Sequence, residues 1–265
     1  MAQLPLCVVT ASGVLRAVRQ TIMAPWMTLV MEGIEHLAAI RGSQVASRPS
    51  SRQGVRRMIE AGPAGQIVIL NGAPRSGKSA IAVVIQQAFD GVWMNLGVDR
   101  FMQATPERYQ PGIGLRPGGE RRDLEPLVVT LYRAMYESIA VHSRLGLNVV
   151  VDVGHHDAHS VPLGILPDCA RRLAGLPVLV VGVRCPLRTV MERRHATWGG
   201  GLADDGSVPG PVRLWQEAVH VPGIYDLDVD TSALSAADCA GLIRQHLKDG
   251  ARPSACRRLA AMTAA

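Results

Sequence analysis

Residues 66–79 read QIVILNGAPRSGKS, and the organisation of the whole chain follows from them. The short apolar run of residues 66–70 predicts a buried strand, and the apolar period that starts near Ser79 predicts a helix. Between them lies the pattern GxxxxGKS, whose glycines let backbone N–H groups curl around phosphate oxygens at the positive end of a helix. Because a strand precedes the motif and a helix follows it, a phosphate-binding P-loop is favoured over a Gly/Ser turn that leads into an ordinary helix.

The motif residues are the predicted binding site for ATP. We expect Lys78 to reach the β and γ phosphates and Ser79 to hold a Mg²⁺ ion. The chain has only two lysines, Lys78 and Lys248, and one of them stands in this motif. The predicted nucleotide-binding residues are Gly72, Ala73, Pro74, Arg75, Ser76, Gly77, Lys78 and Ser79.

Beyond the motif, short apolar runs alternate with helical periods, which is typical of a parallel sheet covered on both faces. The remaining strands are expected at residues 92–98, 148–153, 177–184 and 225–229, and helices near residues 79–89, 123–145, 161–173, 186–196 and 233–247. The prediction is an α/β fold with a doubly wound, parallel five-stranded sheet of the P-loop NTPase type, with ligands at the carboxyl ends of the strands.

The predicted kinase domain covers residues 65–249. Residues 1–64 form an N-terminal extension that is expected to be partly helical or disordered. Met58 is an alternative start residue, in which case the upstream part would not be translated; a regulatory arm is the other interpretation. Residues 250–265 are expected to be a flexible tail.

The composition narrows the classes of partner. The chain has 265 residues, of which 48% are hydrophobic and 19% charged, and a formal net charge of +6. The sequence has no apolar run of the roughly 18 residues needed to cross a membrane, and its arginines form no basic stripe interleaved with aromatic rings. Five scattered cysteines without a CxxC pair predict neither a zinc site nor a disulfide framework. We expect a cytoplasmic protein with neither nucleic acid nor membrane as partner.

Asp99 is the candidate catalytic base. In the predicted sheet, Val98-Asp99-Arg100 closes the second strand, where a carboxylate would point into an acceptor site opposite the P-loop. Phosphoryl transfer needs a group that orients the attacking hydroxyl and takes its proton. The alternative is that Asp99 is the N-cap of a helix, because an apolar period starts at Phe101.

Asp152 ends a buried strand, the arrangement in which a carboxylate holds Mg²⁺ in P-loop enzymes. Its alternative role is to cap a loop. His155, His156 and His159 follow at once, together with Asp157, and are expected to line the acceptor pocket or to lie on a solvated loop rather than to bind a metal.

Arginines gather after the fourth predicted strand, at Arg184, Arg188, Arg193 and Arg194, ahead of a Gly-rich segment. Guanidinium groups on a lid stabilise the charge of the transferred phosphoryl group and help to exclude water. We expect Arg194 to be catalytic and Arg193 to bind the nucleotide. The alternative is an arginine-rich, solvated helix face.

With these motifs in this order, residues 66–247 resemble the chloramphenicol phosphotransferase family. The shared stretches are Ile69-Leu70-Asn71-Gly72, Ser76-Gly77-Lys78-Ser79, Gly97-Val98-Asp99, Val151-Asp152, Val181-Gly182-Val183-Arg184-Cys185, Tyr225-Asp226 and Val229-Asp230-Thr231. The resemblance implies a shikimate-kinase-like fold, ATP and Mg²⁺, and a hydroxylated acceptor deprotonated by Asp99. Two segments depart from the family: residues 196–201 replace its further lid arginines, and the acceptor segment, residues 102–124, has its own composition.

The leading hypothesis is an ATP-dependent O-phosphotransferase acting on a small hydroxylated molecule. A kinase for a metabolite or nucleotide sugar is the alternative within the same class. A non-catalytic, ATP-binding regulatory protein is the alternative from another class, motivated by the missing lid arginines. The sequence leaves the acceptor and the oligomeric state open.

Overall fold

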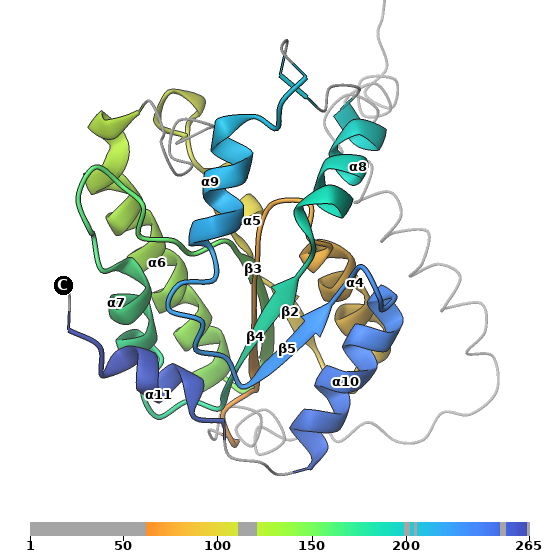
Figure 1. The fold of residues 1–265 in the computed structure, drawn as a ribbon. Helices are drawn as coiled ribbons and strands as arrows, with labels where there is room; N and C mark the ends of the chain where they lie inside the picture. Colours follow the sequence, from red (N-terminus) through yellow and green to blue (C-terminus); the bar gives the residue numbers. More distant parts are fainter. Residues whose placement is uncertain (1–61, 111–120, 199–201, 204–205, 250–252, 264–265) are drawn as a thin grey trace, which may run out of the picture. The chain divides into compact units, whose positions relative to one another are not determined.

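The computed structural model describes residues 62–110, 121–198, 202–203, 206–249 and 253–263. Nearly all of the predicted N-terminal extension therefore lies outside the described residues. The described chain forms an open sheet of five parallel strands in the order β2-β3-β1-β4-β5 (Figure 1). The strands are β1 (Ile67–Asn71), β2 (Trp93–Asn95), β3 (Asn148–Val153), β4 (Val178–Arg184) and β5 (Leu227–Asp230). The predicted α/β architecture is confirmed.

Helices cover both faces of this sheet (Figure 1). They are α4 (Lys78–Ala88), α5 (Val98–Ala104), α6 (Glu125–Arg144), α7 (Ile165–Arg172), α8 (Leu187–Trp198), α9 (Gly210–Ala218), α10 (Ala236–Lys248) and α11 (Ala255–Ala260), with 3-10 turns η1 (Glu107–Tyr109) and η3 (Arg122–Leu124). No helix in the described ranges is long and apolar enough to cross a membrane.

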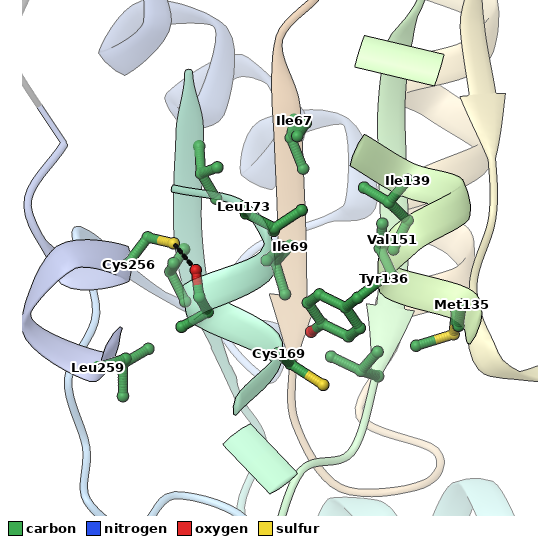
Figure 2. Close-up of a cluster of buried hydrophobic side chains, with 14 of the residues drawn as sticks. Ile67, Ile69, Met135, Tyr136, Ile139, Val151, Cys169, Leu173, Cys256 and Leu259 are labelled. Atoms are coloured by element: carbon green, nitrogen blue, oxygen red, sulfur yellow. Dashed lines mark hydrogen bonds between the residues drawn. The ribbon is translucent and has the colours of Figure 1, made fainter. Parts of the chain in front are cut away.

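The core has two halves because alternate residues of β1 point to opposite faces. Ile67 and Ile69 pack on one face with α6, α7 and α11, as Figure 2 shows. Val68 and Leu70 pack on the other face with α4 and α10. All five residues of β1 are buried, as expected for a central parallel strand.

The second predicted strand is shorter than expected, and this moves Asp99. β2 ends at Asn95, whose side-chain oxygen accepts the Gly97 N–H at 3.1 Å, and α5 begins at Val98. Asp99 therefore lies in the first turn of a helix, and the prediction that it closes a strand is wrong.

The start of α7 and the C-terminal tail also differ from the prediction. α7 begins at Ile165 instead of residue 161, because the Asp157 carboxylate accepts the N–H groups of Leu163 and Gly164 and holds the preceding turn. The tail predicted to be flexible contains α11, whose residues Ala255, Cys256 and Leu259 are buried. Asp226 fixes its start by accepting the N–H groups of Ser254 and Ala255 at 2.7 and 2.9 Å.

Candidate active site

The P-loop connects the end of β1 to the start of α4. Ser76 N–H donates to the Ala73 carbonyl at 3.1 Å and closes the turn, while Arg75 and Gly77 adopt positive φ angles of 67° and 93°. Gly72 has no room for a side chain, since a Cβ atom there would lie 2.5 Å from the Val183 carbonyl oxygen. The loop thus has the tight, glycine-dependent backbone of a phosphate-binding cradle.

Lys78 folds back over this loop. Its ammonium group donates to the Ala73 carbonyl at 2.7 Å. Burial lowers the pKa of Lys78 from 10.5 to about 8, against the opposing effect of the Asp152 and Asp99 carboxylates. Negative charge from a nucleotide's phosphates would favour the protonated form again, because opposite charges stabilise each other strongly in a partly desolvated site.

Ser79 and Asp152 meet at the carboxyl end of the sheet. The Ser79 hydroxyl donates to Asp152 Oδ2 at 2.7 Å. Asp152 lies on β3 opposite Leu70 of β1, which brings its carboxylate beside the first turn of α4. The pair offers two hard oxygen donors, the kind of ligand that Mg²⁺ prefers.

Gly97 makes room for the Asp152 carboxylate. A Cβ atom at Gly97 would lie 1.6 Å from Asp152 Oδ1 and 3.0 Å from the Asp152 carbonyl oxygen. The same glycine is the N-cap of α5, so the helix that carries Asp99 starts against the carboxylate of Asp152. In the sequence, Gly97 belongs to a stretch shared with the family, and no pattern there indicates this role.

Asp99 lines the cavity in front of the P-loop. It is not the N-cap of α5, so the capping alternative is wrong. No hydrogen bond engages its carboxylate within the described part of the chain. Its negative charge raises the pKa of Lys78 and so opposes the larger lowering effect of burial.

The cavity has a volume of about 770 Å³, and its lining residues fall into two chemically different groups. One group consists of the P-loop, Arg193, Asp152 and Asp99. The other group is largely apolar and aromatic, and we call it the acceptor end. It is lined by Val98, Phe101, Met102, Val128, Leu131, Tyr132, Met135, His155, His156, His159, Ile165 and Trp215.

The predicted pocket histidines do line this cavity. His155 is 2% exposed; its Nε2 lies 2.8 Å from the Tyr136 hydroxyl, and its ring centroid lies 4.7 Å from that of Tyr132. Burial lowers the pKa of His155 to about 3, so the ring is neutral at neutral pH. Burial also lowers the pKa of His159, although the Glu125 and Asp157 carboxylates oppose this shift.

Of the four predicted lid arginines, Arg193 lines the cavity and Arg194 is not among its lining residues. The catalytic role of Arg194 stays a prediction. Arg184 pairs with Asp228 at 2.7 Å, and Arg188, which is 90% exposed, pairs with Glu192 at 3.0 Å. For Arg188 the alternative of a solvated helix face therefore fits better.

Two polar residues support the site through long-range hydrogen bonds, and the sequence assigned no role to the first of them, Asn71. Asn71, 4% exposed, donates to the Val219 carbonyl at 2.8 Å and to the Tyr225 hydroxyl at 2.9 Å, and accepts the His155 N–H at 2.8 Å. Thr231 is bonded to both the P-loop and Arg193. A polar residue at the end of an apolar strand was the available signal for Asn71.

A parallel sheet with a P-loop after β1 and a cavity beside the loop is typical of P-loop nucleotide-binding proteins. The sequence profile described as chloramphenicol phosphotransferase-like protein matches residues 65–248, and the chain belongs to this family. It is thus a small-molecule kinase, as the sequence predicts.

Among curated proteins, the chain is similar to "Putative O-phosphotransferase Rv2636" of Mycobacterium tuberculosis. The two are 26% identical over 217 residues, which cover 74% of this chain and 88% of the relative. Among solved structures it is similar to a shikimate kinase from Acinetobacter baumannii, with 12% identity, a TM-score of 0.46 and coverage of 71% and 95% of the two chains. A gluconokinase from Sinorhizobium meliloti shares 21% identity, with a TM-score of 0.44 and coverage of 74% and 94%.

Proposed function

We propose that this protein transfers the γ-phosphate of ATP to a hydroxyl group of a neutral, largely apolar small molecule, for which chloramphenicol is one candidate. The observation that carries the proposal is the single cavity in which Asp99 lies together with the phosphate cradle and an apolar, aromatic wall. Use of ATP implies a cytoplasmic location for the enzyme.

Each residue of the site has its own role in the proposed reaction. Asp99 takes the proton of the acceptor hydroxyl as its oxygen bonds to the γ-phosphorus, while the bond from phosphorus to the β–γ bridging oxygen breaks and ADP leaves. Lys78 and the backbone of the P-loop hold the phosphates, and Arg193 adds positive charge beside them. Ser79 and Asp152 would hold Mg²⁺, which when bound neutralises charge on the β and γ phosphates.

The charges of the cavity favour a neutral acceptor. The lysine and arginine side chains that line the described cavity are Arg75, Lys78 and Arg193, and all belong to the P-loop or to α8. The acceptor end presents apolar side chains and histidines whose pKa values are lowered at His155 and His159. An anionic acceptor would lose hydration there without gaining a fixed countercharge from the described lining residues, which is costly.

Comparing neutral and anionic acceptors tests this proposal. The full chain is incubated with ATP and Mg²⁺, and ADP release is measured with chloramphenicol, other neutral aromatic and aliphatic alcohols, and hydroxy acids such as shikimate and gluconate. We expect acceptor-dependent ADP release with one or more neutral compounds and none with the acids. A preference for the acids would overturn the proposal and favour the metabolite-kinase alternative.

A further inference from the structure

Thr231 ties together three parts of the nucleotide-binding end. It is the first residue after β5 and is 8% exposed. Its hydroxyl donates to the Ser76 carbonyl of the P-loop at 2.7 Å and accepts from Nη1 of Arg193 on α8 at 3.0 Å. Its backbone N–H donates to the Arg184 carbonyl at the end of β4, at 3.0 Å. The threonine is thus fixed to the sheet and bonded to both the P-loop and the lid helix.

The bond to Ser76 fixes the direction of one P-loop peptide. The C=O and N–H of a trans peptide point in opposite directions in one plane. The Ser76 carbonyl points to Thr231, so the N–H of the same peptide, which belongs to Gly77, points away from Thr231. Gly77 lines the cavity, and a Cβ atom placed on it would meet the Thr231 side chain at 3.4 Å. The Thr231 hydroxyl therefore holds the Gly77 N–H directed away from β5.

Hydrogen bonds from Arg193 to Thr231 also hold α8 beside this threonine. Nη2 of Arg193 donates to the Thr231 carbonyl at 2.6 Å, and Nη1 also lies 3.4 Å from the Arg75 carbonyl and 3.4 Å from Cys185 Sγ. Arg193 thus contacts the P-loop and also lines the cavity. Its guanidinium position depends on Thr231 through two hydrogen bonds.

We propose that Thr231 is a positioning residue for the phosphates of the nucleotide. Its hydroxyl orients the Gly77 amide and anchors Arg193, and so couples β5, the P-loop and α8. The inference rests on the proposed function in that the bound ligand is a nucleoside polyphosphate. It assigns Thr231 no contact with the acceptor, because Thr231 belongs to neither group of lining residues.

Two substitutions in the full chain distinguish the role of the Thr231 hydroxyl from the role of the side chain's shape. Thr231→Val keeps the shape and removes the hydroxyl's hydrogen bonds to Ser76, Arg193 and Arg184, whereas Thr231→Ser keeps the hydroxyl. Dissociation constants of ADP and AMP are measured by calorimetry without acceptor, together with the unfolding temperature. We expect Thr231→Val to weaken ADP binding about 10-fold, with a much smaller change for AMP. This is the loss expected when the Gly77 amide no longer donates one hydrogen bond to a phosphate oxygen. Thr231→Ser should stay within about 2-fold of the parent protein, since it retains the hydrogen bond.

Equal ADP affinity in the valine and serine variants would overturn the inference. So would an equal loss for ADP and AMP, because that would indicate a general structural defect instead of a misplaced phosphate cradle. A double-mutant cycle combines Thr231→Val with Arg193→Lys. In the Arg193→Lys background, Thr231→Val should weaken ADP binding less than it does in the parent protein. Full additivity of the two losses in ADP binding would contradict the proposed coupling. These binding constants need no acceptor, so the inference can fail or hold independently of the proposed phosphotransferase activity.

Discussion

The hydroxyl of Ser79 donates a 2.7 Å hydrogen bond to Oδ2 of Asp152, which joins the first turn of α4 to the end of β3. Ser79 and Asp152, the next-to-last residue of β3, are 73 residues apart in the chain. Parallel pairing of β1 with β3 brings them together, because the carboxyl ends of both strands meet at one edge.

Asp152→Asn is expected to raise the Mg²⁺ concentration that gives half-maximal activity by about 10- to 100-fold, a range typical for weakening the surroundings of a metal ion. The amide keeps the size of the side chain and removes its negative charge. A Mg²⁺ titration of ADP release checks this prediction. Glu192→Gln, on the exposed face of α8, serves as the control. An unchanged Mg²⁺ requirement in Asp152→Asn would remove Asp152 from the metal site.

Gly97→Ala is expected to lower kcat on the order of 100-fold, the effect of misplacing a reacting group by about 1 Å. The added methyl group would collide with Asp152 Oδ1 and shift either that carboxylate or the start of α5, which carries Asp99. Gly241→Ala is the matched control, because a Cβ atom on that helical glycine meets nothing within 4 Å. The kcat values of the two variants are measured in parallel. Full activity of Gly97→Ala would contradict the predicted collision.

The pKa of Lys78 predicts how nucleotide affinity depends on pH. The charged form binds phosphates, and in the free enzyme this form is lost as the pH rises through about 8. We expect kcat/KM for ATP to fall above this pH, since that parameter reports the free enzyme. Lys78→Arg should bind more weakly but without the decline, because an arginine stays protonated. A flat profile in the parent enzyme up to pH 10 would contradict this prediction.

The lowered pKa of Lys78 also makes the free energy of unfolding depend on pH. The Lys78 contribution to this free energy rises with pH, whereas kcat/KM for ATP falls. The folded-state pKa of Lys78 lies below its ordinary value of 10.5, so between about 8 and 10.5 the unfolded chain binds more protons. The contribution of Lys78 to the free energy of unfolding therefore rises with pH across this window. Below pH 8 both states are protonated, and the cost of burying the charge is fully present.

The sequence predicted the parts of the site that lie within a few residues of one strand end. The P-loop and Asp152 each follow a recognisable apolar run, and in the structure Ser79 lies within 2.7 Å of the Asp152 carboxylate. The Asp99 environment was predicted less well, because a single apolar run covers β2 and the start of α5. The hydrogen bond from Gly97 to Asn95 ends the strand early, and periodicity carries no signal for such a contact.

Sequence patterns could not predict the polar contacts between residues far apart in the chain. Thr231 and Ser76 are 155 residues apart, and Asn71 and Tyr225 are 154 residues apart. α11 was missed for a similar reason, because its short apolar face is recognisable only when α7 is present to bury it. Residues that support a site from a distant element become visible only in the folded chain.

The most direct test of the proposed reaction is the effect of Asp99→Asn on phosphate transfer and on nucleotide binding, measured in the same protein. The amide keeps the shape of the side chain and cannot take a proton from the acceptor. We predict that acceptor-dependent ADP release falls about 100- to 10,000-fold, the range for loss of a general base, while the dissociation constant of ATP changes less than about 3-fold. Undiminished transfer by Asp99→Asn, or an equal loss of transfer and ATP binding, would contradict the assignment of Asp99 as the base.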